Sequence, residues 1–217
     1  MKRLIIICEG QTEIEFCKDV LFRHFINIGT IIQTPLIKKS GGGIVPWSVL
    51  KKQIELHLKE RDAIVTTFID YYGIPDNYNF PNWEESKKIA DKSLRMDFLE
   101  NAMKNDINQA LQSRYIPYIQ LHEFEGLLFN NINVFDQNFN TSELNSRDEL
   151  LAILNTYPNP ELINDNPISA PSKRLEKIIT GYSKIVFGSI LAEEIGLNSM
   201  RQKSPRFNNW VDILENI

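Results

Sequence analysis

A short apolar run near the N-terminus constrains the fold more than any other feature of the sequence. Residues 4–8 (LIIIC) are followed directly by Glu9 and Gly10, and then by Thr12 and Glu15 at capping-box spacing. A run of β-branched residues that ends at a glycine indicates a buried strand. A threonine with a glutamate three residues later indicates the start of a helix. Glu9 is therefore predicted at the carboxyl end of a strand, where open α/β sheets place their ligand sites.

A second acid occupies an equivalent position. Asp70 directly follows another apolar run (AIVTTFI) that reads as a strand. Because the carboxyl ends of parallel strands meet at one edge of a sheet, we expect Glu9 and Asp70 to lie close together. Glu13 lies one helical turn beyond Glu9, and Glu123 and Glu125 follow a further predicted strand. Carboxylate oxygens suit Mg²⁺, so these acids form a candidate metal site; the alternative is a set of solvated surface acids.

The first 120 residues alternate between strand and helix patterns, which predicts a parallel sheet with right-handed crossovers. Pro117 would make the fourth strand an edge strand, or else the proline would be confined to the start of that strand. Gly41, Gly42 and Gly43 predict a flexible turn. The remainder reads as mostly helical, with a last helix that starts at Ser204 and Pro205. The predicted strands are residues 4–8, 31–36, 63–69 and 115–120, and the predicted helices in this part are 13–25, 47–58 and 94–111.

These patterns predict an α/β fold with a parallel sheet of about four strands and flanking helices. Residues 1–130 are expected to form the core and residues 131–217 a helical C-terminal extension packed on it as one structural unit. A chain of 217 residues that is 42% hydrophobic can bury such a core. Residues 71–93 are rich in aromatics and too long for a simple connection, so they read as an insertion near the site. Their aromatic side chains either stack on bases or pack the insertion against the sheet.

Composition limits the location and the partners. No stretch approaches the ~20 apolar residues that a membrane span needs. Cys8 and Cys17 read as buried thiols in a reducing compartment, so we expect a cytoplasmic protein without a membrane partner. The net charge of −4 argues against non-specific coating of nucleic acid. Residues 171–206, however, hold seven Lys or Arg against three Glu, which permits local phosphate binding or is an ordinary solvated surface.

Two basic residues are the candidate phosphate contacts. Lys173 and Arg174 follow Ser172 at a predicted helix start. A cation beside a helix N-terminus is unfavourable unless an anion binds there, which favours a phosphate contact for Lys173. The alternative is an ordinary surface position. His122 could act as a general base or phosphate contact, because its pKa lies near neutrality. The alternative for His122 is a structural side chain that is hydrogen-bonded to the backbone.

The motifs in order resemble a bacterial Toprim-like family, domain of unknown function 4276, over nearly the whole chain. The motifs that carry the resemblance are residues 8–13 (CEGQTE), 68–75 (FIDYYGIP), 120–129 (QLHEFEGLLF), 164–165 (ND), 170–174 (APSKR), 181–184 (GYSK), 192–197 (AEEIGL) and 207–210 (FNNW).

Toprim domains occur in topoisomerases, primases and the overcoming-lysogenization-defect nucleases. They have a Rossmann-like parallel sheet and bind Mg²⁺ through a Glu after the first strand and an Asp-x-Asp after a later one. The resemblance implies that Glu9, Glu13 and Asp70 hold Mg²⁺ or Mn²⁺. Tyr72 stands where the second Asp would be, so we expect Glu123 or Glu125 to replace it. Residues two apart on a helix point about 200° apart, so one should face the site, and we expect Glu123. The other should face solvent or a basic partner.

The resemblance implies Mg²⁺-dependent phosphodiester chemistry on nucleic acid, DNA before RNA, as a nuclease effector in defence against phages or plasmids. Glu9, Asp70 and Lys173 would be catalytic, and Lys173 and Arg174 would contact substrate phosphate. An ATPase of the AAA or ABC type, encoded nearby, would be the partner. The alternative is a non-catalytic Toprim-like module that docks an ATPase or a nucleotide, and the loss of one acid at Tyr72 favours it.

Overall fold

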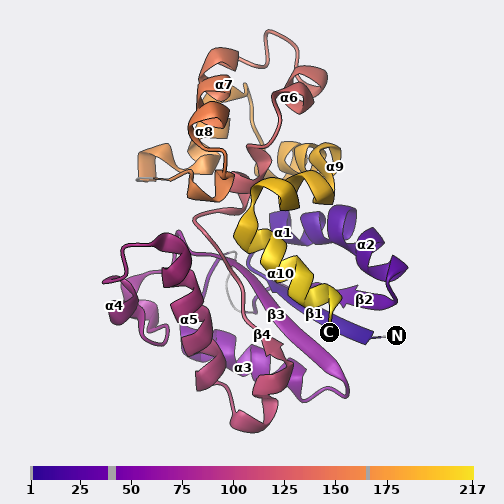
Figure 1. The fold of residues 1–217 in the computed structure, drawn as a ribbon, viewed down its shortest axis with the longest axis vertical. Coiled ribbons are helices and arrows are strands. Elements are labelled where there is room, and N and C mark those ends of the chain that lie inside the picture. The colour runs from indigo at the N-terminus through magenta and orange to yellow at the C-terminus, as the bar shows by residue number, and fades with distance from the viewer. Residues whose placement is uncertain (1, 39–42, 165–166) are drawn as a thin grey trace.

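The computed structural model describes residues 2–38, 43–164 and 167–217. Gly41 and Gly42 of the predicted turn, and Asp165 of the family motifs, lie outside the described residues. The chain forms a parallel sheet flanked by helices, and its C-terminal part is helical (Figure 1). The predicted α/β class is confirmed, and the architecture is consistent with a Rossmann-like fold.

The sheet has the strand order β2-β1-β3-β4, with β5 also paired to β3, and every pair is parallel. In the central pair, Arg3 lies opposite Ala63 and Cys8 lies opposite Phe68. The carboxyl ends of β1 and β3 are therefore neighbours. The strands are β1 (Lys2–Cys8), β2 (Thr30–Gln33), β3 (Ala63–Asp70), β4 (Tyr115–Ile116) and β5 (Ile119–Gln120).

The predicted fourth strand is divided into β4 and β5, and both lie at the edge beside β3 as Pro117 requires. Pro117 has no N–H to donate to the ladder. The next residue, Tyr118, bonds instead to the Thr67 hydroxyl, which accepts from the Tyr118 N–H at 3.1 Å and donates to its carbonyl at 3.0 Å. This side-chain bridge carries the chain across the break before β5 begins.

The first helix begins earlier than predicted. It runs through α1 (Gln11–Phe16), a π-helical turn (Cys17–Leu21) and α2 (Phe22–Asn27). Gly10 is the capping residue, and its N–H donates to Glu13 Oε2 at 2.7 Å. The predicted capping box of Thr12 and Glu15 is wrong, because both residues already lie inside the helix.

Several other predicted boundaries agree with the structure. Helix α3 spans the predicted 47–58, and α10 begins at the predicted Pro205. Helix α5 ends before 111, because Ile107 is extended and the Asn108 side chain starts a 3₁₀ turn by accepting from Ala110 N–H. The helices after α2 are α3 (Trp47–Leu58), α4 (Trp83–Ser86), α5 (Lys92–Asp106), α6 (Ile132–Asn138), α7 (Arg147–Thr156), α8 (Pro171–Ile178), α9 (Lys184–Lys203) and α10 (Pro205–Glu215).

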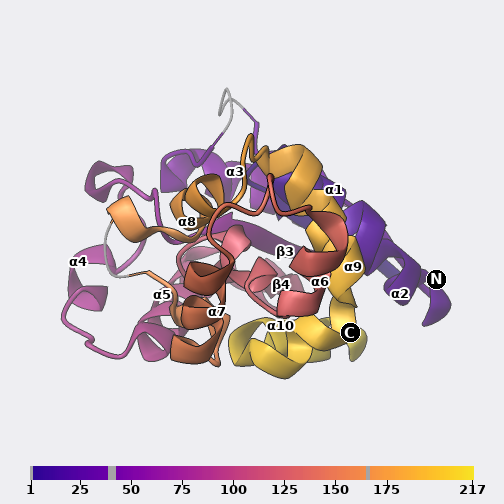
Figure 2. The same cartoon turned by 90° about the horizontal axis from the view of Figure 1, so that it is seen from above.

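Helices cover both faces of the sheet (Figures 1 and 2). Alternate strand residues point to opposite faces, so Ile5 packs with α3, α5 and the insertion, whereas Ile6 packs with α1, α9 and α10. In the insertion, Phe80 and Trp83 are buried in the first of these cores. Cys8 and Cys17 are buried free thiols, as predicted. Across the described residues, helix length and apolarity nowhere reach what a membrane crossing requires.

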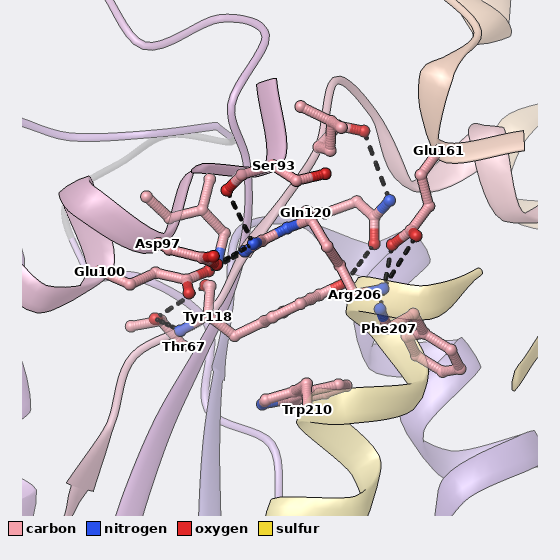
Figure 3. Close-up of polar contacts among 12 residues, drawn as sticks. Thr67, Ser93, Asp97, Glu100, Tyr118, Gln120, Glu161, Arg206, Phe207 and Trp210 are labelled. Atoms are coloured by element: carbon pink, nitrogen blue, oxygen red, sulfur yellow. Dashed lines mark hydrogen bonds and ion pairs between the residues drawn. The ribbon is translucent and has the colours of Figure 1, made fainter. Parts of the chain in front are cut away.

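Helix α10 is held against the sheet by aromatic stacking (Figure 3). Trp210 stacks on Tyr118 with ring centroids 4.5 Å apart and an interplanar angle of 12°. Its Nε1–H donates to the buried Thr66 hydroxyl on β3 at 2.9 Å. An indole that is stacked and hydrogen-bonded in the core fixes both the depth and the rotation of the helix.

A buried charge network fixes the start of the same helix (Figure 3). The Glu161 carboxylate, 1% exposed, accepts the backbone N–H groups of Arg206 and Phe207, each at 3.0 Å. The Arg206 guanidinium pairs with Glu100 at 2.6 Å and with Asp97 on α5. Arg206 thus joins the C-terminal helix to α5 next to the edge of the sheet, and the two acids compensate its charge.

Candidate functional site

Glu9 and Asp70 meet at the carboxyl edge of the sheet. Glu9 follows β1, Asp70 ends β3, and these strands are hydrogen-bonded neighbours. Glu9 Oε2 accepts the backbone N–H of Asp70 at 3.0 Å. Both residues keep only partial solvent exposure. The predicted proximity of these two strand ends is confirmed.

Glu13 joins this edge through the helix start. It is only 6% exposed, and its carboxylate accepts the Gly10 N–H. A Cβ at Gly10 would lie 3.1 Å from Glu13 Oε2, so a larger residue there would shift the carboxylate by a few tenths of an ångström. The turn after β1 therefore brings two acids, Glu9 and Glu13, to one place.

The segment after β5 adds two more acids. His122 has a positive φ of 68°, and its carbonyl accepts the Tyr72 N–H at 2.9 Å. The N–H of Phe124 then donates to Asp70 Oδ1 at 3.0 Å. Glu123 and Glu125 are both buried, at 7% and 2% exposure, and Glu125 has a basic partner, Lys184, which is one of the two surroundings expected for the acid that does not face the site. Both are buried because of local geometry: Glu123 is extended and Glu125 lies in a 3₁₀ turn (Phe124–Leu128), so α-helical spacing does not apply.

Helix N-termini supply donors to both acids. The Glu123 carboxylate accepts the backbone N–H of Ser172 at 2.9 Å and its hydroxyl at 3.2 Å, in the first turn of α8. Glu125 pairs at 2.9 Å with Lys184, the first residue of α9. The positive ends of α8 and α9 therefore face the acids, as does that of α1 at Glu13, and this makes the buried negative charge tolerable. We call Glu9, Glu13, Asp70, Glu123 and Glu125 the acidic cluster.

Glu9, Glu13, Asp70 and Glu125 hold their protons more tightly than free carboxyls do. Burial raises the pKa of Glu9 to about 7; the Asp70 N–H opposes this rise and the charge of Glu13 adds to it. Burial also raises the pKa of Asp70 well above its usual range, and the charges of Glu13, Glu9, Glu125 and Glu123 raise it further. Burial raises the pKa of Glu13 and of Glu125 as well. The cluster therefore carries mutual repulsion that protons or a cation would relieve.

Lys184 is a cation that the sequence analysis missed. Partial burial lowers its pKa, but Glu125 and Glu123 more than offset this, and the pKa is raised. The clue was present in the sequence, because Lys184 follows Ser183 at a helix start as Lys173 follows Ser172. Both helices do begin there, but only their tertiary placement distinguishes the two lysines.

The predicted phosphate contacts have other partners. Lys173 is exposed and pairs with Glu176 at 2.7 Å on the same helix. Arg174 Nε donates to the Ser169 carbonyl at 2.7 Å, and its guanidinium lies 5.9 Å from the centre of the Tyr157 ring. As placed, both cations are engaged outside the acidic cluster.

The acidic cluster suits a divalent cation in donor chemistry but not in side-chain placement. Within residues 2–38, 43–164 and 167–217, no three Asp, Glu, His or Cys side chains are grouped so that they could hold a metal ion. The carboxylates of Glu9, Glu13 and Glu123 instead accept N–H groups. Five oxygen-donor side chains with surplus negative charge are the ligands that Mg²⁺ prefers. Binding would require these side chains to turn from their N–H donors toward the ion.

Comparison with known proteins gives one match. The model of the family described as "Domain of unknown function (DUF4276)" matches residues 8–215. No curated protein and no solved structure matches the chain. The matched range includes the whole acidic cluster and Lys184.

Proposed function

We propose, from the premise that this chain belongs to the DUF4276 family, that the acidic cluster performs divalent-cation-dependent phosphodiester chemistry on nucleic acid, as a nuclease. The observation that carries the proposal is the gathering of five acids at the carboxyl edge of a parallel sheet. Burial and mutual repulsion raise the pKa of Glu9 and of Asp70. Perturbed carboxyls gathered at such an edge are typical of functional sites rather than of structural ones.

Glu9, Glu13 and Asp70 are the proposed holders of Mg²⁺ or Mn²⁺, with Glu123 or Glu125 in place of the acid that Tyr72 replaces. The bound ion would polarise the scissile phosphate and activate water. The acids would release their protons as the ion binds, and the N–H donors of α1 and α8 hold Glu13 and Glu123 in reach. To bind the ion, Glu125 would have to release the Lys184 ammonium. Glu123 would have to release the N–H and hydroxyl of Ser172.

Lys184 is added to Lys173 and Arg174 as a proposed phosphate contact. Its ammonium is bonded to Glu125 within the cluster, and its side chain is 46% exposed, so a substrate can reach it. A lysine at the start of a helix next to a cation site is placed to neutralise negative charge that develops on phosphate oxygens.

The Toprim relationship, the preference for DNA, the ATPase partner and the role in defence come from the sequence resemblance. They are part of the proposal and are tested with it. The rival function is a non-catalytic module that docks an ATPase or a nucleotide. Two observations favour the rival: Tyr72 at the position of the second acid, and the N–H partners that the cluster carboxylates already have.

The test is a cleavage assay on supercoiled plasmid, single-stranded DNA and RNA with Mg²⁺ or Mn²⁺, with and without the ATPase. Asp70→Asn and Glu9→Gln should each reduce cleavage at least about 100-fold, because each removes a charge that holds the ion. The matched control is Glu84→Gln, an exposed acid that pairs with Lys87. Equal cleavage by wild type and Asp70→Asn would contradict the proposal. No cleavage under any condition, with ATPase binding intact, would establish the binding module instead.

A further inference from the structure

The Tyr182 side chain places a buried hydroxyl beside the acidic cluster. Tyr182 lies two residues before the start of α9, and its ring stacks on Phe187 with the ring centroids 6.3 Å apart. The hydroxyl oxygen is buried, and among residues 2–38, 43–164 and 167–217 it has no hydrogen-bond partner. Buried polar groups are nearly always hydrogen-bonded, and an unbonded one destabilises the conformation that leaves it so. The hydroxyl therefore lacks a partner that another conformation of the site could supply.

Three elements of the acidic cluster surround this hydroxyl. A Cβ placed at Gly188 on α9 would lie 3.6 Å from the hydroxyl oxygen, 3.7 Å from the Thr12 methyl and 3.9 Å from a Leu128 methyl. Thr12 lies in the first turn of α1, one residue before Glu13. Leu128 ends the 3₁₀ turn that carries Glu125. Side chains three residues apart in a 3₁₀ turn lie one above the other, so the hydroxyl faces the side of the turn that carries Glu125.

The Tyr182 hydroxyl is also within the electrostatic influence of Glu125. Burial raises the pKa of Tyr182 above its usual range, and the charges of Glu125, Glu123 and Glu176 raise it further. Nearby negative charge disfavours the phenolate, so the hydroxyl keeps its proton and stays a donor. Glu125, however, is bonded to the Lys184 ammonium at 2.9 Å. Tyr182 is therefore a donor beside an acceptor that is engaged with another residue.

The pair of Lys184 and Glu125 has to open for the proposed function. Lys184 must leave Glu125 before it can contact a phosphate, and Glu125 must leave Lys184 if it is to bind the ion. Glu125 is only 2% exposed, so little solvent reaches it to replace the lost donor. A buried carboxylate that loses its cation without gaining another donor is strongly destabilised. A carboxylate can accept several hydrogen bonds, and the Tyr182 hydroxyl is a donor close at hand.

We propose that Tyr182 is a positioning residue: when this pair opens, its hydroxyl donates to the Glu125 carboxylate, and the Lys184 ammonium becomes free for a phosphate oxygen of the nucleic acid. The inference rests on the proposed function and deepens it, because it names the residue that releases a phosphate contact. The hydroxyl is unbonded only while Lys184 holds Glu125. Tyr182 thus disfavours the closed pair and favours the open one.

The test compares Tyr182→Phe, which removes only the hydroxyl oxygen, with the wild type in the absence of divalent cations. The urea midpoint of the variant should equal or exceed that of the wild type, because the lost hydroxyl has no partner while the pair is closed. Binding of a fluorescein-labelled single-stranded oligonucleotide should weaken several-fold. The slope of log K against log salt should fall toward that of Lys184→Gln, which loses about 0.7, one phosphate contact on a single strand.

A double-mutant cycle distinguishes positioning from a purely structural role. In a Glu125→Gln background, Lys184 has lost the carboxylate that holds it, so Tyr182→Phe should change neither affinity nor slope. The matched control is Tyr115→Phe on β4, which removes another buried hydroxyl that has no partner among the described residues. It should leave affinity and slope at their wild-type values. A lowered urea midpoint for Tyr182→Phe, or an effect on binding that persists in the Glu125→Gln background, would overturn the positioning role.

A second probe, inorganic pyrophosphate, separates this inference from the proposed function. Pyrophosphate should raise the Tm of the wild type, and raise that of Tyr182→Phe and of Lys184→Gln less. If this holds but nucleic acid is not cleaved, the positioning role stands and the proposed function fails. If cleavage depends on Asp70 but Tyr182→Phe matches the wild type in affinity, slope and pyrophosphate response, the positioning role is overturned and the function stands. A wild type that binds neither probe also overturns the positioning role.

Discussion

The carboxylate of Glu9 accepts a hydrogen bond from the backbone N–H of Asp70, with 3.0 Å between Oε2 and the nitrogen. This bond joins the residue after β1 to the last residue of β3, so two acids from separate strands share one small region. Burial raises the pKa of Asp70 well above its usual range, and the charges of Glu13, Glu9, Glu125 and Glu123 raise it further. The state of the site therefore depends on pH and on cations.

The pH dependence of stability follows from these raised pKa values. An acid whose pKa is higher in the folded state binds more protons there than in the unfolded chain. The stability it contributes is fully present below its unfolded pKa and is lost as pH rises through the folded pKa, which is about 7 for Glu9. We expect Glu9→Gln to be more stable than the metal-free wild type at pH 8, by on the order of 1–2 kcal/mol, with the difference vanishing near pH 4. Urea unfolding of both proteins from pH 4 to pH 8 measures this difference in the free energy of unfolding. A difference that does not change with pH would contradict the account.

Divalent cations should stabilise the protein. Mn²⁺ or Mg²⁺ that binds only the folded state at 100 times its Kd adds about 2.7 kcal/mol to the free energy of unfolding. We expect the rise in Tm to be larger at pH 8 than at pH 5, because Glu9, with a pKa of about 7, is protonated at the lower pH. Asp70→Asn should lose most of the rise, whereas the surface variant Glu84→Gln should keep it. Equal rises in all three proteins would mean that the ion binds elsewhere.

The position of α10 should depend on Trp210. Trp210→Phe keeps an aromatic ring but loses the bond to the buried Thr66 hydroxyl, so it should cost about 1–3 kcal/mol. Trp210→Ala also leaves a cavity beside Tyr118 and should cost about 3–5 kcal/mol. The control is Ile213→Ala on the same helix, where the side chain is 43% exposed and the loss should be smaller. Chemical denaturation measures all three.

Glu161 should be needed for the start of the same helix. Glu161→Ala leaves the buried N–H groups of Arg206 and Phe207 without their acceptor, and should cost about 2–4 kcal/mol. Glu161→Gln should cost less, because one amide oxygen can still accept. Glu194→Ala, an exposed glutamate on α9, is the control and should change stability by less than about 0.5 kcal/mol. An unchanged midpoint for Glu161→Ala would contradict this role.

The strand ends that form the site were predictable from sequence because each is a local pattern. The runs before Glu9 and Asp70 are apolar and β-branched, and parallel pairing follows from strand–helix alternation. The start of the first helix was not predictable in the same way. The sequence offers two overlapping capping boxes there, Gly10 with Glu13 and Thr12 with Glu15. The structure uses the first, in which the Glu13 carboxylate accepts the Gly10 N–H.

The remaining parts of the site depend on tertiary contacts that no local pattern contains. The positive φ of His122 and the 3₁₀ turn after Glu123 turn both later acids inward, against the helical spacing assumed from sequence. Lys184 forms an ion pair with Glu125, which lies nearly sixty residues earlier in the chain. In sequence it cannot be distinguished from Lys173, because each lysine follows a serine at a helix start.

The most direct test of the central claim, that the acidic cluster holds a divalent cation, is anomalous diffraction from crystals soaked in Mn²⁺. We predict a peak in contact with the carboxylates of Glu9, Glu13 and Asp70, at metal–oxygen distances of roughly 2.1–2.2 Å. The same soak of Asp70→Asn crystals should lose or weaken that peak. A well-ordered wild-type cluster without a peak at saturating Mn²⁺, or peaks only at other acids, would contradict the claim.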